Sequence, residues 1–308
     1  MLRLSLDALQ ILDAIDRRGS FSAAGVALHR VPSTISYTVA KLEDDLGVQV
    51  FERKGPKVKL TPAGVELLKE GRYLLKAAED LEHRVRRVAS GWETELTLGL
   101  DSLFSGAALA DDIAAFYTVA DRTRLRIVRE SLDGTWEALL DRRVDLLIAA
   151  PGVGPSGGGY IAEPLGSIPF VFAVAPTHPL AQISHPIGKA DMHPYRAITV
   201  ADSARRMAAR TVGILFGQDT LTVPDMQSKY ALQVAGIGFG FLPEPCARAA
   251  LASGLLIAKE VEEPRQDETF FLAWRTGENG AALAWWIARM GQANIMQRLS
   301  ERLAQTIS

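Results

Sequence analysis

The chain has 308 residues, with 34 Lys and Arg against 36 Asp and Glu and a formal net charge of −2, a length that predicts two or three domains. Residues 1–90 carry 15 basic against 12 acidic residues and the remainder carries 19 against 24, so only the N-terminal part favours a polyanion. One cysteine, Cys246, excludes an intrachain disulfide and is expected to be a small buried hydrophobe. With neither a signal peptide nor an apolar run of membrane length, the sequence predicts a cytoplasmic protein.

Residues 20–46 predict two helices joined by a tight turn. Ser20 or Ser22 can cap the first helix, and Pro32 suits the first turn of the second. The expected buried faces consist of Ala23, Ala24, Ala27 and Leu28 in the first helix and Ile35, Val39, Leu42 and Leu46 in the second. The opposite face of the second helix carries hydroxyls, an aromatic ring and one cation, and no carboxylate before Glu43. Such a face can approach phosphates and base edges without repulsion.

A basic hairpin follows this pair of helices. Two short β-type runs flank Gly55-Pro56 and contain four cations between residues 53 and 59, which is typical of a wing that grips the DNA backbone. Taken separately, a helical hairpin usually serves packing and a basic loop is usually only solvated; their order within one small domain favours DNA binding. The candidate DNA-binding residues are Ser22, Arg30, Pro32, Ser33, Thr34, Ser36, Tyr37, Thr38, Lys41, Arg53, Lys54 and Lys57.

Residues 1–60 resemble the winged helix-turn-helix of the LysR-type transcriptional regulators, and the resemblance extends over the whole chain. The segments that carry it are Gly19-Ser20-Phe21-Ser22-Ala23-Ala24, Ser33-Thr34-Ile35-Ser36, Leu42-Glu43, Val50-Phe51-Glu52-Arg53 and Leu60-Thr61-Pro62-Ala63-Gly64. Many relatives have polar residues at the positions of Pro32 and Tyr37, so the operator sequence does not transfer from them. The resemblance implies double-stranded DNA, a small-molecule effector and a second copy of the chain as partners, in a homodimer or homotetramer, with RNA polymerase as a further candidate.

Residues 61–92 predict one long helix with a heptad stripe. Its members are Leu67, Gly71, Leu74, Ala78, Leu81, Val85 and Val88, a pattern that favours a partner helix. The alternative is packing on the same chain, but Leu68 and Leu75 can serve that purpose on the neighbouring face. We therefore expect Leu74, Leu81 and Val85 to lie in a dimer interface, the role that the resemblance implies for this helix.

From residue 93 onward, strands alternate with helices, which predicts an α/β regulatory domain. Expected strands are 95–101, 124–130, 144–150, 168–175, 196–200, 220–223, 237–243 and 268–274; expected helices are 105–120, 134–143, one from about Ala204, one from Met226 and one over 281–305. We assign lobe I to 93–164 plus 266–308 and lobe II to 165–265, joined by crossover strands near 160–166 and 260–268. The predicted fold is thus α/β, with an N-terminal all-α winged helix-turn-helix, a linker helix and a two-lobed effector domain like periplasmic binding proteins.

A ligand between two such lobes meets strand ends and helix starts. The candidate effector-binding residues are Asp101, Ser102, Phe104, Asp202, Ser203, Met226, Gln227, Ser228 and Phe239. Their hydroxyls and helix termini suit a polar or anionic ligand, although Ser102, Ser203 and Ser228 could equally be ordinary helix caps. Segments around 202–205, 223–226 and 235–243 resemble the allantoin- and purine-linked subgroup of the family.

Catalytic motifs fall in one glycine-rich loop. Residues 152–157 match G-x-G-x-x-G and 154–158 match G-x-S-x-G, but an extended segment follows where a phosphate cradle or nucleophile elbow needs a helix. The five histidines are expected at the surface or in turns and lack metal spacing. We therefore expect no enzyme, cofactor or metal. The alternatives are a hydrolase using Gly154–Gly158 and a solute receptor, which would leave residues 1–92 unexplained.

Overall fold

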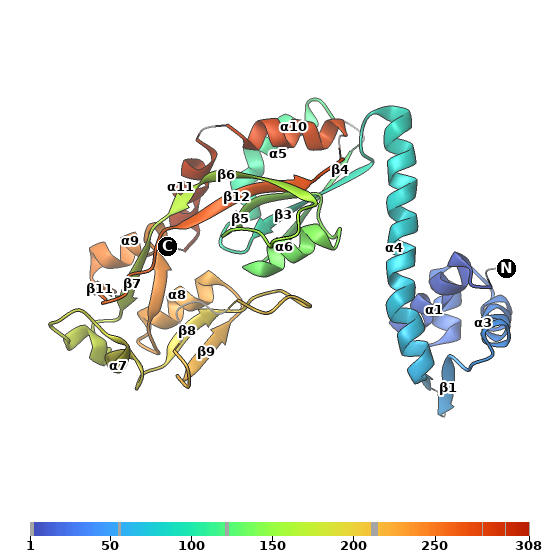
Figure 1. Ribbon diagram of the computed structural model, residues 1–308, viewed down its shortest axis with the longest axis horizontal. Coiled ribbons are helices and arrows are strands. Elements are labelled where there is room, and N and C mark those ends of the chain that lie inside the picture. Colours follow the sequence, from blue (N-terminus) through green and yellow to red (C-terminus); the bar gives the residue numbers. More distant parts are fainter. Residues whose placement is uncertain are drawn as a thin grey trace. The chain divides into compact units, whose positions relative to one another are not determined.

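The computed structural model describes residues 3–54, 57–120, 123–210, 215–278, 280–292 and 294–307. The chain divides into two compact units, Met1–Ala89 and Ser90–Ser308, and Figure 1 shows the helices and strands of each. Within the described residues, no helix has the length and apolar composition needed to cross a membrane.

The first unit is a small helical domain with a β-hairpin. Its elements are α1 (Leu6–Arg18), α2 (Phe21–Ala27), α3 (Pro32–Leu46), β1 (Phe51–Lys54), β2 (Lys57–Leu60) and α4 (Pro62–Ser90). The Ser20 hydroxyl accepts a hydrogen bond from Ala23 N at 3.1 Å and caps α2, so Ser20 rather than Ser22 is the cap. Pro32 is the first residue of α3, where its missing N–H costs nothing.

The turn between α2 and α3 depends on a glycine. A Cβ on Gly25 would lie 2.7 Å from Arg30 O, so no larger residue fits where the two helices meet. Ile35, Val39 and Leu42 of α3 are buried against α1 and α2 as predicted. Two expectations are wrong: Ala27 is exposed and Leu46 is 38% exposed, because each lies at the end of its helix, beyond the neighbouring elements.

Helix α4 begins on the first unit's core. Leu68 is buried in that core, and a Cβ on Gly71 would lie 2.6 Å from Leu9 Cδ2. Arg72 contacts Asp13 at 2.7 Å and Asp16 at 2.9 Å, both on α1. The first turns of α4 therefore pack on their own chain.

The second unit contains a five-stranded sheet in the order β4-β3-β5-β12-β6. Its strands are β3 (Glu95–Asp101), β4 (Arg124–Glu130), β5 (Leu146–Pro151), β6 (Tyr160–Ile168) and β12 (Glu268–Arg275). Strands β3, β4 and β5 are parallel, whereas β12 is antiparallel to both β5 and β6. Strand β12 thus returns from the far end of the sequence to the first sheet.

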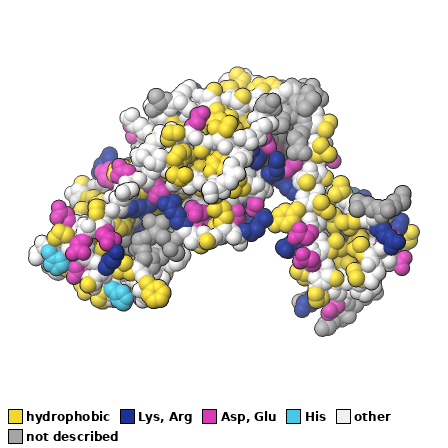
Figure 2. Space-filling model, viewed as in Figure 1, with side chains coloured by type: hydrophobic (Ala, Val, Ile, Leu, Met, Phe, Trp, Pro, Cys, Tyr) yellow, Lys and Arg dark blue, Asp and Glu magenta, His cyan; other side chains and the backbone are white. Residues whose placement is uncertain are grey.

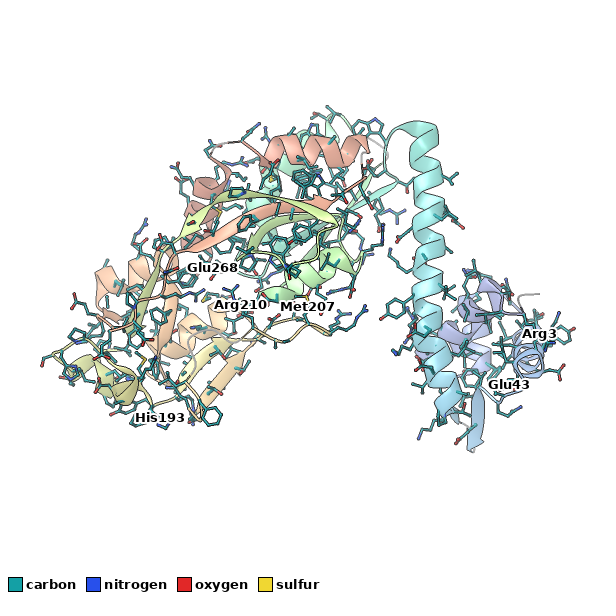
Figure 3. All side chains as sticks on the ribbon, in the orientation of Figure 1. Arg3, Glu43, His193, Met207, Arg210 and Glu268 are labelled. Atoms are coloured by element: carbon teal, nitrogen blue, oxygen red, sulfur yellow. The ribbon has the colours of Figure 1, made fainter. Side chains whose placement is uncertain are left out.

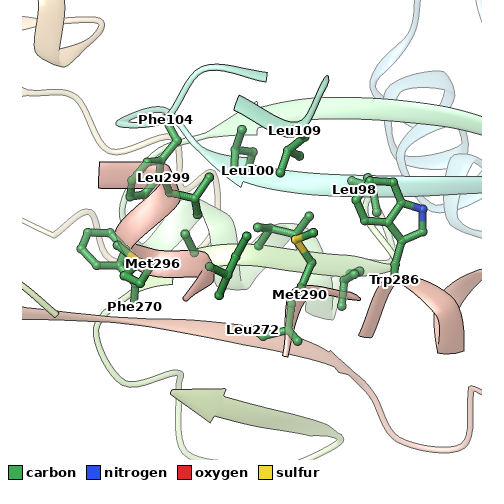
Figure 4. Close-up of a cluster of buried hydrophobic side chains, with 14 of the residues drawn as sticks. Leu98, Leu100, Phe104, Leu109, Phe270, Leu272, Trp286, Met290, Met296 and Leu299 are labelled. Carbon is green, nitrogen blue, oxygen red and sulfur yellow. The ribbon is translucent and has the colours of Figure 1, made fainter. Parts of the chain in front are cut away.

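Helices cover both faces of this sheet (Figure 1). They are η1 (Gly106–Leu109), α5 (Ala110–Tyr117), α10 (Ala281–Met290) and α11 (Ile295–Ile307) on one face and α6 (Asp133–Leu140) on the other. Figure 4 shows Leu98, Leu100, Phe270 and Leu272 of the sheet packed with Trp286 and other helix side chains. Trp136 of α6 fills the opposite face and donates its Nε1–H to Pro151 O at 3.0 Å.

The remaining strands form two smaller sheets, β10-β7-β11 and β8-β9. The elements are β7 (Phe170–Val174), η2 (Pro179–Gln182), α7 (Lys189–Met192), β8 (Ala197–Val200), β9 (Thr220–Val223), α8 (Met226–Val234), β10 (Gly240–Pro243), α9 (Glu244–Ser253) and β11 (Ile257–Ala258). Strands β8 and β9 are parallel. A bridge between Ala197 and Phe239 connects β8 to the segment before β10.

The structure corrects three expected elements. No helix begins at Ala204: residues 201–210 are irregular, because their backbone N–H groups bind side-chain carboxylates instead of one another. The long helix expected over 281–305 is broken at Gly291, which ends α10. The strand expected over 237–243 begins only at Gly240, because Gly236 (φ 75°) turns the chain first.

Two segments connect the groups of strands. Residues 160–166 belong to β6, which pairs with β12 along its whole length, so the first crossing comes at Ile168–Phe170. The return runs through residues 259–267, where Lys259 N donates to Phe172 O and Val261 bridges Ile187 before β12 begins.

Candidate functional site

The residues predicted to read DNA lie on the outer face of α3. Ser33, Thr34, Ser36 and Lys41 are exposed and Tyr37 is 70% exposed, so each can reach a partner outside the unit. Thr38 is half-buried and donates its hydroxyl to Thr34 O at 3.0 Å. That bond within the helix makes Thr38 a weaker candidate for base contact.

The first carboxylate on α3 holds the hairpin in place. Glu43 Oε1 accepts hydrogen bonds from Val50 N at 2.7 Å and Phe51 N at 3.1 Å, and Figure 3 shows Glu43 where α3 faces the start of β1. The Phe21 and Phe51 rings meet edge to face at 5.5 Å. The acid therefore positions the wing relative to α2 and α3.

The other predicted DNA contacts are placed less directly. Pro32 and Ser22 are exposed, and the Arg30 guanidinium forms two contacts with Asp7, at 2.7 and 2.9 Å. Arg30 already has an anionic partner, which the sequence pattern did not show. The side chains of Arg53, Lys54 and Lys57 lie outside the described residues.

The predicted interface residues of α4 are exposed within the first unit. Leu74 is 49%, Leu81 55% and Val85 62% exposed. In contrast, Gly71 of the same heptad stripe is buried against Leu9. The stripe thus changes from internal packing to free apolar surface at Leu74.

A cavity of about 340 Å³ opens in the second unit. Parallel strands β3, β4 and β5 end beside it at Asp101, Glu130 and Pro151, and β8 and β9 end beside it from the other group of strands. Carboxyl ends of parallel strands are where α/β proteins bind small molecules. The cavity is lined by Asp101, Ser102, Leu103, Ser131, Leu132, Pro151, Phe170, Thr199, Val200, Ala201, Asp202, Ala209, Arg210, Thr222, Met226, Lys229, Arg265, Glu268 and Phe270.

Four of the predicted effector residues line this cavity: Asp101, Ser102, Asp202 and Met226. Ser102 Oγ accepts from Ser131 Oγ at 2.6 Å. Asp101 is buried and accepts from Leu103 N and Leu132 N, at 2.9 and 3.2 Å. Burial raises the pKa of Asp101 to about 7, and its two backbone donors only partly offset that effect.

The other five predicted effector residues do not line the cavity. Phe104 and Phe239 are 1% exposed and belong to hydrophobic cores. Gln227 and Ser228 lie in the first turn of α8, where Asp225 caps the helix by accepting from Ser228 N at 2.8 Å. Ser203 binds Glu130 and Ser131 instead of facing the cavity. Strand-end position alone does not decide which side chains point inward.

Two arginines and a glutamate at the strand crossing were missed. Glu268 accepts from Arg210 at 2.8 Å and from Arg265 at 2.6 Å, and Figure 3 shows Arg210 and Glu268 together. The Arg265 guanidinium carbon lies 3.6 Å from the centre of the Phe170 ring. Arg265 lies three residues before Glu268, whereas Arg210 comes from a segment 58 residues away, so no sequence spacing connects Arg210 to the other two.

Lys229 was also missed, although its position on α8 gave a signal. It lies three residues after Met226 and four before Gln233, the spacing of one helix face. Gln233 is buried and donates to Ala173 O at 2.9 Å and Gly240 O at 3.1 Å. The spacing therefore places a lysine on the inward face of α8.

An irregular segment after β8 joins the two groups of strands beside the cavity. Glu137 of α6 accepts from Arg205 N at 3.0 Å and from Arg206 N and Met207 N at 2.8 Å. Asp202 accepts from Gly134 N at 3.0 Å, at the start of α6. Residues 202–207 are thus fastened to α6 by backbone hydrogen bonds to two carboxylates.

The two motifs that match catalytic patterns lie in a loop. Residues 152–159 form a loop that leads into β6 and not into a helix, as the sequence predicted. In the part of the chain that the structure describes, no cluster of His, Cys, Asp and Glu could hold a metal ion.

His178 is buried, and its Nδ1 accepts from Leu180 N at 3.2 Å. Cys246 is buried as predicted, which raises the pKa of its thiol to about 12.

Charge on the visible surface of the second unit is mixed. Figure 2 shows Lys and Arg side chains interspersed with Asp and Glu over this face of the unit. Ion pairs of this unit include Arg206 with Asp141 and Arg142 with Glu278. No single-sign field for a polyanion is visible on this face, in agreement with the acidic balance of the C-terminal part.

Comparisons with known proteins agree with this architecture. Residues 6–65 match the bacterial regulatory helix-turn-helix protein, lysR family, and residues 89–294 match the LysR substrate binding domain. The full-length regulator CbnR complexed with its target DNA superposes with a TM-score of 0.60 at 20% identity, over 94% of this chain and 100% of that chain. This likeness supports the fold.

Curated relatives cover nearly the whole chain. The uncharacterized HTH-type transcriptional regulator YeeY of Escherichia coli K12 is 40% identical over 91% of both chains. The HTH-type transcriptional regulator PunR of the same strain is 34% identical over 94% of both, and the HTH-type transcriptional activator AllS of Klebsiella pneumoniae is 34% identical over 84% of this chain and 96% of AllS. The chain therefore belongs to the LysR family of transcriptional regulators, with an N-terminal helix-turn-helix and an effector-binding domain.

Proposed function

We propose that this regulator reads its operator through the outer face of α3 and the basic hairpin, dimerises through α4, and responds to a small polar metabolite bound in the 340 Å³ cavity. The observation that carries the proposal is the cavity itself. Polar and charged side chains from both groups of strands converge on it, beside the crossing segments where the two groups could move relative to one another.

The DNA-binding part rests on the exposed, carboxylate-free face of α3. Tyr37 projects from the middle of that face, and Glu43, which follows it, is engaged with the hairpin backbone. Arg53 lies in the basic run of β1. Tyr37→Ala should change preference among sites, whereas Arg53→Ala should weaken all sequences and lower the salt slope by about one charge.

Gel-shift titrations at several salt concentrations measure both effects. Lys69→Ala is the matched control, because Lys69 lies on α4 and contacts Glu66 and Glu70. If a chain without residues 1–60 bound the operator as well as the full chain, this part of the proposal would be wrong.

The dimerisation part rests on the free apolar surface of Leu74, Leu81 and Val85. Paired half-sites multiply a weak single contact with DNA, so a dimer or a tetramer suits the proposed recognition. Contact with RNA polymerase would be required in addition if the regulator activates transcription.

The effector part rests on the hydroxyls and charges of the cavity. Purines, nucleosides and ureides are the first candidates, because the sequence resembles the allantoin- and purine-linked subgroup. Calorimetry with a panel of these compounds tests it, on wild type and on Ser102→Ala, which removes a cavity hydroxyl. We expect weaker effector binding in the variant and unchanged operator binding by the free protein. Full affinity in Ser102→Ala would remove this serine from the site.

A further inference from the structure

Lys229 is a buried cation at the wall of the cavity. Its side chain lines the cavity and the residue is only 7% exposed. The ammonium group lies beside the backbone of Gly240, where an added Cβ would be 3.0 Å from Nζ. Gln233, one turn later, fixes the same face of α8 by donating to two backbone carbonyls. Lys229 therefore belongs to the inward face of α8.

The carboxylates that line the cavity already have donors. Glu268 binds Arg210 and Arg265. Asp202 accepts from Arg210 N at 2.7 Å, as well as from Gly134 N and Ala204 N. Asp101 accepts from two backbone N–H groups. None of these acids lies within ion-pair distance of the lysine.

Lys229, in contrast to these carboxylates, has no hydrogen-bond or ion-pair partner among the described residues, and the positive charge of Arg265 repels its Nζ. Burial, and then that repulsion, lower the pKa of Lys229 to about 7. An unpaired buried ammonium is costly, and a bound anion would compensate it.

The rest of the lining restricts the size and charge of such an anion. Leu132, Phe170 and Phe270 supply apolar surface, and Ser102 and Thr199 supply hydroxyls. Both cavity arginines form ion pairs with Glu268, whereas Lys229 forms none within the described residues. A single lysine ammonium suits a single carboxylate better than a doubly charged phosphate.

We propose that the effector is a small organic acid whose carboxylate contacts Lys229 and whose body lies against the apolar wall. This inference rests on the proposed effector role of the cavity. It assigns the effector to the carboxylic acids, a class that excludes neutral purines, nucleosides and ureides. Lys229 would then be the residue that selects an acid over its uncharged analogue.

The test compares small carboxylic acids of 4–8 carbons, aliphatic and aromatic (roughly a size that fits the cavity), each paired with its primary amide of the same shape. Calorimetry on the full chain at pH 6.5 measures both members against wild type and Lys229→Met, which keeps the side chain's length and removes its charge. Lys189→Met is the control, because Lys189 is exposed and contacts Glu263 at 2.7 Å.

We expect at least one acid to bind wild type and Lys189→Met equally and to lose about 10- to 100-fold in affinity in Lys229→Met, the effect of removing a hydrogen bond to a charged group. Its amide should bind weakly and equally to all three proteins. Because Lys229→Met removes an unpaired buried charge, it should fold, and operator binding without effector should be unchanged.

Three results overturn the proposal: no acid binds, amides bind as well as their acids, or Lys229→Met retains the affinity for the acid. Binding of nucleosides or ureides in any of these cases would preserve the effector role of the cavity and refute only the anion. If neither the acids nor the neutral compounds bound, both the proposed anion and the proposed effector role of the cavity would be refuted.

Discussion

Replacing Glu137 by Gln tests whether the segment after β8 is held to α6 by charge. The carboxylate accepts three backbone N–H groups at 2.8–3.0 Å and lies 3.5 Å from Arg143, and the residue is 3% exposed. Burial raises the pKa of Glu137, but the N–H donors of Met207, Arg206 and Arg205 outweigh it and the net pKa is lowered. The carboxylate is therefore more stable in the folded chain than in water.

The amide of Glu137→Gln keeps one acceptor oxygen and places an NH₂ group against backbone donors. Losing one or two charge-assisted hydrogen bonds, at about 1.5–3 kcal/mol each, should lower the free energy of unfolding by about 3–5 kcal/mol. Urea denaturation followed by tryptophan fluorescence measures it. Asp111→Asn is the control, since Asp111 is 77% exposed and contacts the exposed Arg302 at 3.4 Å; it should change stability by less than about 0.5 kcal/mol.

The same carboxylate predicts a pH dependence. Because its folded pKa lies below the ordinary Glu value of 4.5, its contribution is complete above that value and is lost as the pH falls through the folded pKa. Glu137→Gln should therefore lose its disadvantage against wild type in acid. A loss of less than about 1 kcal/mol at pH 7, or a difference that does not shrink below pH 4.5, would refute the reasoning.

Three further predictions concern single side chains. Lys229→Met should raise the free energy of unfolding at pH 7 by about 2–5 kcal/mol. Because the folded pKa of Lys229 is lowered to about 7, the stability of wild type should approach that of the variant as the pH rises from 7 toward 10.5. Thermal melts measure this, and a difference in stability that stays constant with pH would contradict it. Leu81→Asp should reduce the mass in light scattering from oligomer to monomer, while Val65→Asp, equally exposed on α4, should not; an unchanged mass for Leu81→Asp would exclude this stripe from the interface. Glu43→Ala should leave two backbone N–H groups at the start of the hairpin without their acceptor, lower the free energy of unfolding by about 1–3 kcal/mol and weaken operator binding. Wild-type affinity of this variant in a gel shift would show that DNA binding does not need the Glu43 contact with the hairpin.

The sequence by itself determined the elements whose signals are local. The serine caps, Pro32 and the apolar spacing predict α2 and α3, and alternating strands and helices predict the first lobe. The prediction of a helix from about Ala204 is wrong because of tertiary contacts. Residues 203–210 are irregular, since Glu137 and Asp202 accept hydrogen bonds from the N–H groups that a helix would use.

Only the tertiary structure decided which side chains meet in the cavity. Asp101 ends β3 and Asp202 follows β8, strands of two different sheets, and only the packing of the two groups of strands brings them to one cavity. Arg265 lies three residues before Glu268, but Arg210 meets Glu268 from a segment 58 residues away, a contact that no sequence spacing encodes. Ser203, a plausible ligand residue by position, is turned away by its hydrogen bond to Glu130. Side-chain direction depends on the partners that folding brings close, and those partners are absent from any local pattern.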